Sequence, residues 1–357
     1  QAMYDTNAGS TSMGSTDNVF LGYQAGGGTW ANAASIKNVA IGNYAMDSAL
    51  NGADSNVAVG YNALSGLTTG DFNIGIGHGA GYDITTGASN IIFGRLAGDT
   101  MTTTSNTVLI GHDAGGAINS TDANGTVAIG YQALQDLTSG QNSVAVGYRA
   151  LADLTTGDYN TAVGYGALDA ITTSDYNTAL GWGAGGSTSN TTGAQNTFIG
   201  GEAGLGIINK NDNTFVGYRA GATNRAGASS TIIGSQAGYS PQGATYSGSY
   251  NLFAGYGAGY HTGGDKNAIL GAYAGYYTTG SQNTFVGYAA GHGGTTSAPF
   301  SSGVDNVAIG YEALKRFTSG QQNTALGKGA LAYVTTGGSN IGIGYQAGGN
   351  TTTANGN

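Results

Sequence analysis

A five-residue unit of the approximate form N-[VT]-x-[IVL]-G recurs nineteen times in this chain of 357 residues, with its glycines running from Gly22 to Gly344. Ten of the eighteen intervals between successive glycines are 17 residues long, and the others range from 16 to 23. A unit of this length cannot bury its own apolar side chains, whereas stacked copies can. The period therefore predicts an all-β parallel β-solenoid of about nineteen coils. We assign residues 1–17 to a lead-in, 18–349 to a single solenoid domain and 350–357 to a tail.

Two columns of the repeat are nearly uniform when the copies are aligned on this glycine, which we number position 0. Position +3 is Ala in all nineteen copies, and position −4 is Asn in fifteen. An invariant Ala indicates a site too narrow for a larger side chain. Asparagines about 4.8 Å apart in neighbouring coils predict a ladder of stacked amides. The ladder residues that we select are Asn18, Asn38, Asn56, Asn73, Asn160, Asn177, Asn196, Asn213, Ala25, Ala63, Ala133 and Ala167.

Position −2 bears on assembly, because it holds eight Ala, five Phe, four Ile or Leu and two Gly. Position −1 is apolar in all copies as well, and successive residues of a strand face opposite sides. If position −1 faces the interior, position −2 faces outward and requires a cover. We therefore expect a homo-oligomer, with a parallel trimer as the favoured form; the alternative is a wider coil that covers this column itself. The expected interface residues are Phe20, Phe198, Phe215, Phe253 and Phe285.

The repeat also resembles known ones. The unit N-x-[AV]-[IV]-G-x-x-A, as in residues 38–42 with Ala45, resembles the head repeats of YadA-like trimeric adhesins. The longer form, best seen in residues 160–174 and 323–337, is closer to repeats of phage and bacterial tail-fibre-domain proteins. This resemblance implies a left-handed β-roll, a trimer and a surface or virion fibre, and it transfers no catalytic residue. The adhesin repeat is shorter, and no coiled-coil stalk, membrane anchor or chaperone domain is recognisable.

Charge and composition exclude several classes of partner. The formal net charge is −9 with only 8% charged residues and no Lys/Arg cluster, so we expect no nucleic-acid binding. No apolar stretch approaches the roughly 20 residues needed to span a bilayer, so we expect no membrane insertion. The absence of Cys excludes disulfides and thiolate metal sites, and is compatible with the extracellular location that a fibre implies.

No constellation of catalytic, cofactor-binding or metal-binding residues is apparent, and we expect a protein that is not an enzyme and uses no cofactor. His78 and His112 lie two coils apart, roughly 10 Å if stacked, which is too far to share a metal. A column of carboxylates at Asp71, Asp158 and Asp175 could hold Ca²⁺. Solvated turn residues are the favoured interpretation, because the dense spacing of a calcium-binding repeat is missing.

Position +1 holds ten Tyr and one Trp. We interpret this column as a stacking ladder that stiffens the solenoid. The alternative is a set of exposed ring faces that stack on the sugars of a glycan. The residues that represent both interpretations are Tyr131, Tyr148 and Tyr165.

The function predicted from these features is a structural fibre or shaft of a virion or cell-surface appendage, most similar to a phage tail fibre. The extra residues of the longer repeats gather at one point, at 185–195, 238–250 and 291–305. Such an edge is often the binding face of a repeat protein, here for a host-surface glycan or protein receptor. The main alternative is the head of a trimeric autotransporter-type adhesin. Ice binding by a threonine array and a polysaccharide-cleaving tailspike are the less favoured alternatives.

Overall fold

The computed structural model describes residues 14–28, 30, 33–186, 193–207, 209–223, 227–241, 248–294, 300–349 and 352–356. The chain divides into two compact units, Gln1–Asn177 and Thr178–Asn357. Among the described residues, each repeat copy contributes one strand of three residues, and a single 3-10 turn, η1 (Thr121–Ala123), follows β6. The all-β solenoid predicted from the repeat period is confirmed, with coils about 17 residues apart.

The first unit contains the strands β1 (Val19–Leu21), β2 (Val39–Ile41), β3 (Val57–Val59), β4 (Ile74–Ile76), β5 (Ile91–Phe93), β6 (Val108–Ile110), β7 (Val127–Ile129), β8 (Val144–Val146) and β9 (Thr161–Val163). The second contains β10 (Thr178–Leu180), β11 (Thr197–Ile199), β12 (Thr214–Val216), β13 (Thr231–Ile233), β14 (Leu252–Ala254), β15 (Ala268–Leu270), β16 (Thr284–Val286), β17 (Val307–Ile309), β18 (Thr324–Leu326) and β19 (Ile341–Ile343).

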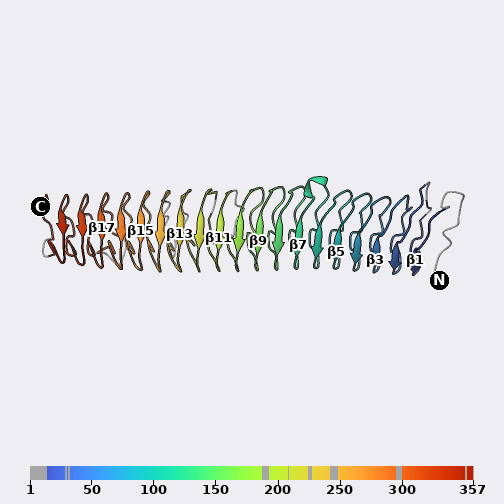
Figure 1. Cartoon of the computed structure of the whole chain (residues 1–357), viewed down its shortest axis with the longest axis horizontal. Coiled ribbons are helices and arrows are strands. Elements are labelled where there is room, and N and C mark those ends of the chain that lie inside the picture. The colour runs from blue at the N-terminus through green and yellow to red at the C-terminus, as the bar shows by residue number, and fades with distance from the viewer. Residues whose placement is uncertain are drawn as a thin grey trace. The chain divides into compact units, whose positions relative to one another are not determined.

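Within each unit, consecutive strands pair in parallel and in register, so that every residue lies beside its equivalent in the next coil (Figure 1). Between β2 and β3, for example, Ala40 pairs with Ala58. The strands lie side by side and the rest of each coil returns the chain to the next strand. Because the register never shifts, a sequence column becomes a physical row of side chains along each unit.

The glycine at position 0 is required by the distance between coils. Gly60 has a φ of 139°, a value that L side chains rarely adopt. A Cβ atom at Gly60 would lie 2.4 Å from the carbonyl oxygen of Gly77 in the next coil. The backbone therefore turns out of the strand at a point where neighbouring coils touch, which no other residue permits.

Positions −2, +3 and +4 contribute to the interior of each coil, and large side chains at position +7, such as Leu67, Leu137 and Phe317, are buried there as well. The central residue of every strand, position −2, is buried, and its two neighbours are exposed or half-buried. In sixteen of the nineteen copies, positions −2 and +4 have reciprocal sizes: a large side chain at −2 is accompanied by Gly at +4, and Ala at −2 by Leu or Met at +4. In the coil of β12, a Cβ on Gly221 would lie 2.4 Å from the ring of Phe215. The two positions therefore share one interior volume.

Interior volume overrides backbone preference at position +4. Leu64, Leu134 and Leu168 are buried there with φ values of 48°, 51° and 51°. An L side chain in this left-handed region costs roughly 1–2 kcal/mol, which is why Gly is the usual occupant. Leu is used where position −2 is Ala, because burying a leucine stabilises the fold by about 1.5–3 kcal/mol.

The assembly inference drawn from position −2 is wrong in its premise. All five phenylalanines lie inside their own coil, where the single chain leaves them between 0% and 3% exposed. Position −1, which the prediction places in the interior, lies on the outer face of the strand. The predicted two-residue alternation is correct, but the inner and outer positions are exchanged. The sequence does not distinguish them because both columns are apolar. The alternative, a coil that covers the −2 column itself, describes the structure.

The asparagine column forms the hydrogen-bond ladder that its spacing predicts. The Oδ1 of Asn38 accepts from the backbone N–H and the Nδ2 of Asn56, both at 3.0 Å. The Nδ2 of Asn56 also donates to the carbonyl oxygen of Gly70, at 2.9 Å. The carboxamide thus links neighbouring coils and joins both ends of its own coil. In the second unit, Asn213 contacts Asn196 in the same way.

The alanine column lines the interior beside this ladder. Ala25, Ala63, Ala133 and Ala167 are at most 1% exposed. Replacing Ala167 with Leu should destabilise the chain by about 1–3 kcal/mol, since the surrounding coil cannot expand without displacing the next. Thermal denaturation should show the loss, and Ala34→Leu, at an exposed alanine, should leave the melting temperature unchanged. An unchanged melting temperature for Ala167→Leu would contradict tight packing of this column.

The reciprocal sizes at −2 and +4 predict a compensated double substitution. Leu109→Ala should cost about 2–5 kcal/mol through the cavity it leaves, and Gly115→Leu about 1–3 kcal/mol through overpacking. The coil of β7 already has Ala at −2 and Leu at +4, so the double variant copies its neighbour. We expect the double variant to be more stable than the sum of the singles by about 1–3 kcal/mol. Strictly additive free energies of unfolding would show that the positions do not share a volume.

Candidate binding surfaces

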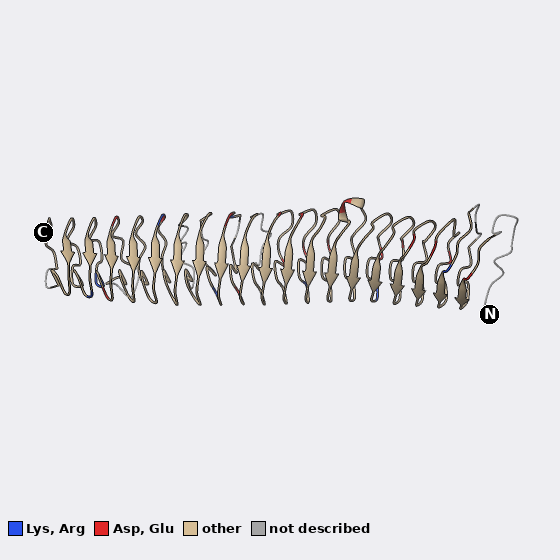
Figure 2. Ribbon diagram, viewed as in Figure 1, with Lys and Arg blue, Asp and Glu red and all other residues tan. Residues whose placement is uncertain are grey.

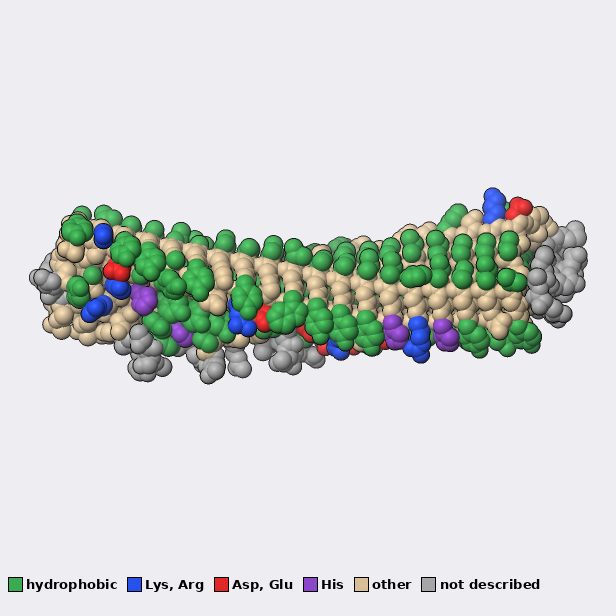
Figure 3. All heavy atoms as spheres, turned by 90° about the horizontal axis from the view of Figure 1, so that it is seen from below, with side chains coloured by type: hydrophobic (Ala, Val, Ile, Leu, Met, Phe, Trp, Pro, Cys, Tyr) green, Lys and Arg blue, Asp and Glu red, His purple; other side chains and the backbone are tan. Residues whose placement is uncertain are grey.

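The outer face of the strands carries an apolar row at position −1 in both units and a second apolar row at position −3 in the first unit, whereas position −3 is Thr in six of the ten copies of the second unit. Positions −3 and −1 point outward, and Ile91, Phe93, Leu180 and Ile233 are 43–52% exposed. Figure 3 shows two neighbouring rows of hydrophobic side chains over the N-terminal coils, toward the right of the view. Charged side chains are sparse on the ribbon as a whole (Figure 2). Because soluble monomers rarely expose apolar patches above a few hundred Å², this sheet face is a candidate interface.

Position +1 forms an aromatic edge in which rings stack along the coil axis. Tyr131 lies 5.1 Å from Tyr148 with an interplanar angle of 8°, and Tyr148 lies 4.9 Å from Tyr165 at 7°. His112 stacks on the other face of Tyr131 at 5.3 Å. Both faces of Tyr131 and Tyr148 are therefore covered by neighbouring rings. The interpretation as a stacking ladder describes this geometry, and the ring faces of these two tyrosines are not available to sugars.

The histidines of this edge are held by their neighbours. His78 stacks on Tyr61, with ring centroids 5.2 Å apart. The guanidinium of Arg95 contacts the Nε2 of His112 at 2.6 Å. The described residues contain no group of three or more His, Asp or Glu that could hold a metal ion.

The carboxylates of the suggested calcium column serve the backbone instead. The Oδ1 of Asp71 accepts from the N–H of Asp54 at 2.8 Å. The Oδ1 of Asp158 accepts from Gln141 at 2.9 Å, and that of Asp175 from Asp158 at 2.8 Å. Each carboxylate therefore caps a backbone donor of the preceding coil, in agreement with the turn interpretation.

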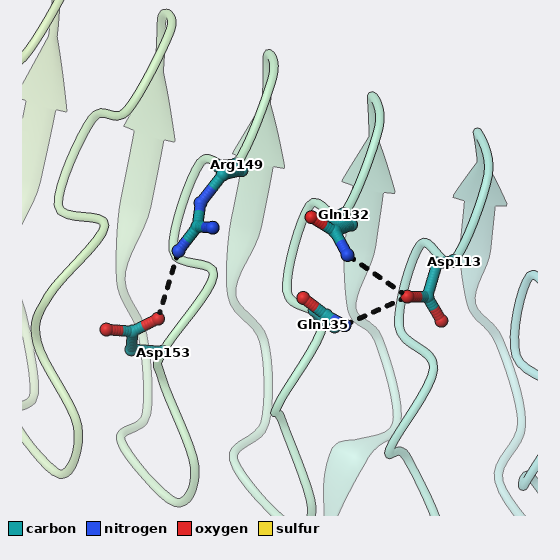
Figure 4. A network of polar contacts seen from close by, with 5 residues as sticks. All are labelled: Asp113, Gln132, Gln135, Arg149 and Asp153. Carbon is teal, nitrogen blue, oxygen red and sulfur yellow. Dashed lines mark hydrogen bonds and ion pairs between the residues drawn. The ribbon is translucent and has the colours of Figure 1, made fainter.

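A second set of carboxylates lies beside the aromatic edge of the first unit (Figure 4). Asp113 accepts from the Nε2 atoms of Gln132 at 3.4 Å and Gln135 at 2.9 Å, and Arg149 pairs with Asp153 at 3.5 Å. These polar side chains come from successive coils and face one another along the unit. The row is acidic overall.

Stacking like charges in this row changes their proton affinity. Burial raises the pKa of Asp99, and the carboxylates of Asp113 and Asp83 raise it further. Burial likewise raises the pKa of Asp136, with an added contribution from Asp153. The repeat therefore accommodates few charged residues, because like charges at equivalent positions of successive coils would lie close together.

The second unit carries an aromatic cluster built from two neighbouring columns of rings. Two short stacks lie side by side: Tyr260 on Tyr276 at 4.5 Å, and His261 on Tyr277 at 5.4 Å. Phe300 stacks on His261 at 4.5 Å. Burial raises the pKa of Tyr276 and lowers the pKa of His261. The cluster is thus a group of stacked, half-buried rings, and it is not apparent from any single sequence column because it joins residues of different columns.

The insertions that were expected to bind a receptor lie partly outside the described residues. Residues 187–192, 242–247 and 295–299 lie outside the described residues. The structure therefore describes only the residues on either side of these segments of the expected attachment edge. Phe300, in the aromatic cluster, directly follows the last of these segments. The cluster therefore lies at the base of an insertion.

Comparisons with protein-family models, with curated proteins and with solved structures found no match. Within the described ranges, no helix is long and apolar enough to cross a membrane.

The raised pKa of Asp99 predicts a pH-dependent stability. Asp99 binds its proton more tightly in the folded chain, so its charged form destabilises the fold above the ordinary aspartate pKa of 3.8. The free energy of unfolding therefore rises as the pH falls through the raised pKa, because protonation removes the partly buried charge of Asp99. Asp99→Asn should stabilise the chain at pH 7 by less than about 1 kcal/mol, because the carboxylate is partly exposed and screened. The gain should vanish at pH 3, where both forms are neutral.

Melting temperatures of the two chains at pH 3 and pH 7 measure this difference. The matched control is Asp305→Asn, which removes an exposed carboxylate. If Asp99→Asn gave the same change at both pH values, the effect would not arise from the charge.

Proposed function

We propose that this chain is a structural fibre component of a surface appendage, of the tail-fibre type, that assembles as a parallel homo-oligomer through its apolar sheet face. The observation that carries the proposal is position −1, which is apolar in all nineteen copies although it faces outward. A column that met only water would accept polar residues freely. The trimer expected from the resemblance to adhesin and tail-fibre repeats is the favoured form.

A second copy of the chain is the partner that best matches this face. The apolar rows repeat once per coil, about every 4.8 Å. A second solenoid has the same period and can keep its side chains in register along the whole row. A globular partner with an irregular surface could match only a few coils. The geometry therefore favours self-association over capture of another protein.

The free energy from burying this face is comparable with the cost of association. Burying an aliphatic side chain completely contributes about 1.5–3 kcal/mol, so burying the exposed half of one contributes about 1 kcal/mol. Nine of the ten −1 residues of the second unit are Val, Leu or Ile, and these would then contribute about 9 kcal/mol. Association costs an estimated 4–15 kcal/mol in lost freedom. The first unit adds to the favourable side through position −1 and through position −3, which is Val or Ile in eight of its nine copies.

In this proposal the fibre is extracellular and attaches to its target through the insertion edge. The aromatic cluster at the base of an insertion supports a contact role for this edge, since rigid aromatic platforms are common at interfaces. The proposed role is structural and not enzymatic. Most residues belong to columns of equivalent side chains stacked from coil to coil, and the clustered polar side chains form hydrogen bonds to the backbone or to one another.

Lysines on the sheet face should prevent assembly. We expect the native chain to sediment as an oligomer, with three times the 35.3 kDa chain mass as the favoured value. The double variant Ile91→Lys/Phe93→Lys, and the same change at Leu180 and Ile233, should shift the mass toward the monomer. Each lysine would place a charge in the buried contact, which costs several kcal/mol when unpaired. Analytical ultracentrifugation measures the mass.

The matched control is Thr103→Lys/Asn106→Lys, which adds the same charge at exposed turn positions. The column of Asn106 holds Lys37 and Lys266 in other coils, so lysine is compatible with its backbone. This control should remain oligomeric. A native chain that sediments as a monomer at micromolar concentration would contradict the proposal, as would an oligomer that the sheet-face variants leave intact.

A further inference from the structure

A hollow opens on the aromatic edge of the second unit between the coils of β17, β18 and β19. Its volume is about 310 Å³, near the lower end of the range for small-ligand pockets. Its lining comprises Tyr311, Glu312, Lys328, Gly329, Tyr333 and Gln346, together with Ala332 and Gly349. The lining therefore combines two phenol rings with a cation, a carboxylate and an amide.

The hollow exists because one side chain is missing from a column. Position +2 is Glu312 in the coil of β17 and Gln346 in that of β19, but Gly329 in the coil between them. The atom nearest to a Cβ on Gly329 would be the Cγ of Gln346, in van der Waals contact at 3.4 Å, so a longer side chain at this position would extend into the hollow. The two flanking side chains form the walls, and the Tyr311 and Tyr333 rings, 48% and 47% exposed, border it.

The charge of this region is opposite to that of the chain. Lys315, Arg316 and Lys328 gather within two coils, while the whole chain carries −9. Glu312 is paired with Lys315 at 2.7 Å. Among the described residues, neither Lys328 nor Arg316 has a carboxylate within ion-pair distance. Lys328 instead lies 5.3 Å from the Tyr311 ring centre, and Arg316 lies 4.9 Å from that of Tyr333.

We propose that this hollow binds a sugar residue that carries a carboxylate, such as a uronic or nonulosonic acid at a glycan terminus. The Lys328 ammonium would pair with the sugar carboxylate in a charge-assisted hydrogen bond. The Gln346 amide and the Glu312 carboxylate would bind ring hydroxyls. The ring of Tyr311 is covered by Tyr288, stacked on it at 5.3 Å, and by the Lys328 ammonium. The face of Tyr333 that Arg316 does not cover suits the weakly positive C–H bonds of a pyranose.

One chain forms the hollow, so the site does not depend on the proposed fibre assembly. Where the chain does act as a fibre, the site adds a specific glycan contact on the aromatic edge, separate from the insertions. Sugar binding and assembly can therefore fail independently of each other.

Saturation-transfer NMR on the full chain tests the site with glucuronate, galacturonate and N-acetylneuraminate. Glucose is the matched neutral ligand, since it differs from glucuronate only in carrying CH₂OH in place of the carboxylate. We expect saturable binding of at least one acidic sugar, at least fivefold tighter than that of glucose. Lys328→Gln should weaken this binding roughly tenfold, the effect of losing one charge-assisted hydrogen bond.

The decisive variant is Gly329→Gln, which should abolish binding by filling the hollow. Glutamine already occupies position +2 in other coils at a φ of 53–57°, as at Gln24, Gln132 and Gln236, so the variant suits the local backbone. Gly183→Gln makes the same change in an open place in another coil and should leave binding intact. The melting temperature and sedimenting mass of each variant show that fold and assembly are retained.

Three outcomes would overturn the proposal. Acidic sugars could all fail to bind more tightly than glucose, or Gly329→Gln could retain full binding. Inorganic sulfate could also displace the sugar at equal concentration, which would identify a simple anion site. Failure of the native chain to bind acidic sugars while it remains oligomeric would reject this site alone and leave the proposed fibre role standing.

Discussion

The contact between neighbouring coils at position 0 is the constraint on which the rest of this structure depends. A Cβ at Gly60 or Gly77 would lie 2.4 Å from a carbonyl oxygen of the next coil, so the coils approach as closely as backbones allow. At that spacing each side chain lies beside its own equivalent. Groups that stack well with themselves, such as amides and phenol rings, form rows. Carboxylates repel their own kind, and burial together with the neighbouring carboxylates raises the pKa of Asp99.

Variation inside the coil is permitted only where it is compensated. Positions −2 and +4 exchange volume, so that Phe215 requires Gly221 and Ala162 is accompanied by Leu168. The leucine adopts a positive φ to fill the interior, which shows that packing outweighs local backbone preference at this position. This relation is visible in the sequence as a correlation of two columns, and the structure explains it by the interior volume that the two positions share.

The close approach of the coils constrains the outward-facing side chains less than the interior ones, and the proposed binding surfaces are formed by these outward-facing side chains. The sheet face, the aromatic edge and the hollow at Gly329 each depend on which side chain stands beside its equivalent in the next coil. The stacked rings of Tyr131 and Tyr148 leave their faces unavailable, whereas Gly329 lies beside a hollow between Glu312 and Gln346. Glycine at position +2 does not suffice for such a hollow, since Gly79, Gly166, Gly183 and Gly257 share the position; the side chains of the neighbouring coils decide.

The sequence by itself determined the period, the strand position, the uniform register and the asparagine ladder, because these follow from spacing alone. It could not determine which face of the strand is interior. Positions −2 and −1 are both apolar, and the alternation of side chains does not say which of the two points inward. Only the tertiary structure decided this, by placing Gly221 against the Phe215 ring and thereby closing the coil around position −2. The aromatic cluster at His261 and the hollow beside Lys328 also needed the fold, because they join residues of different columns from several coils.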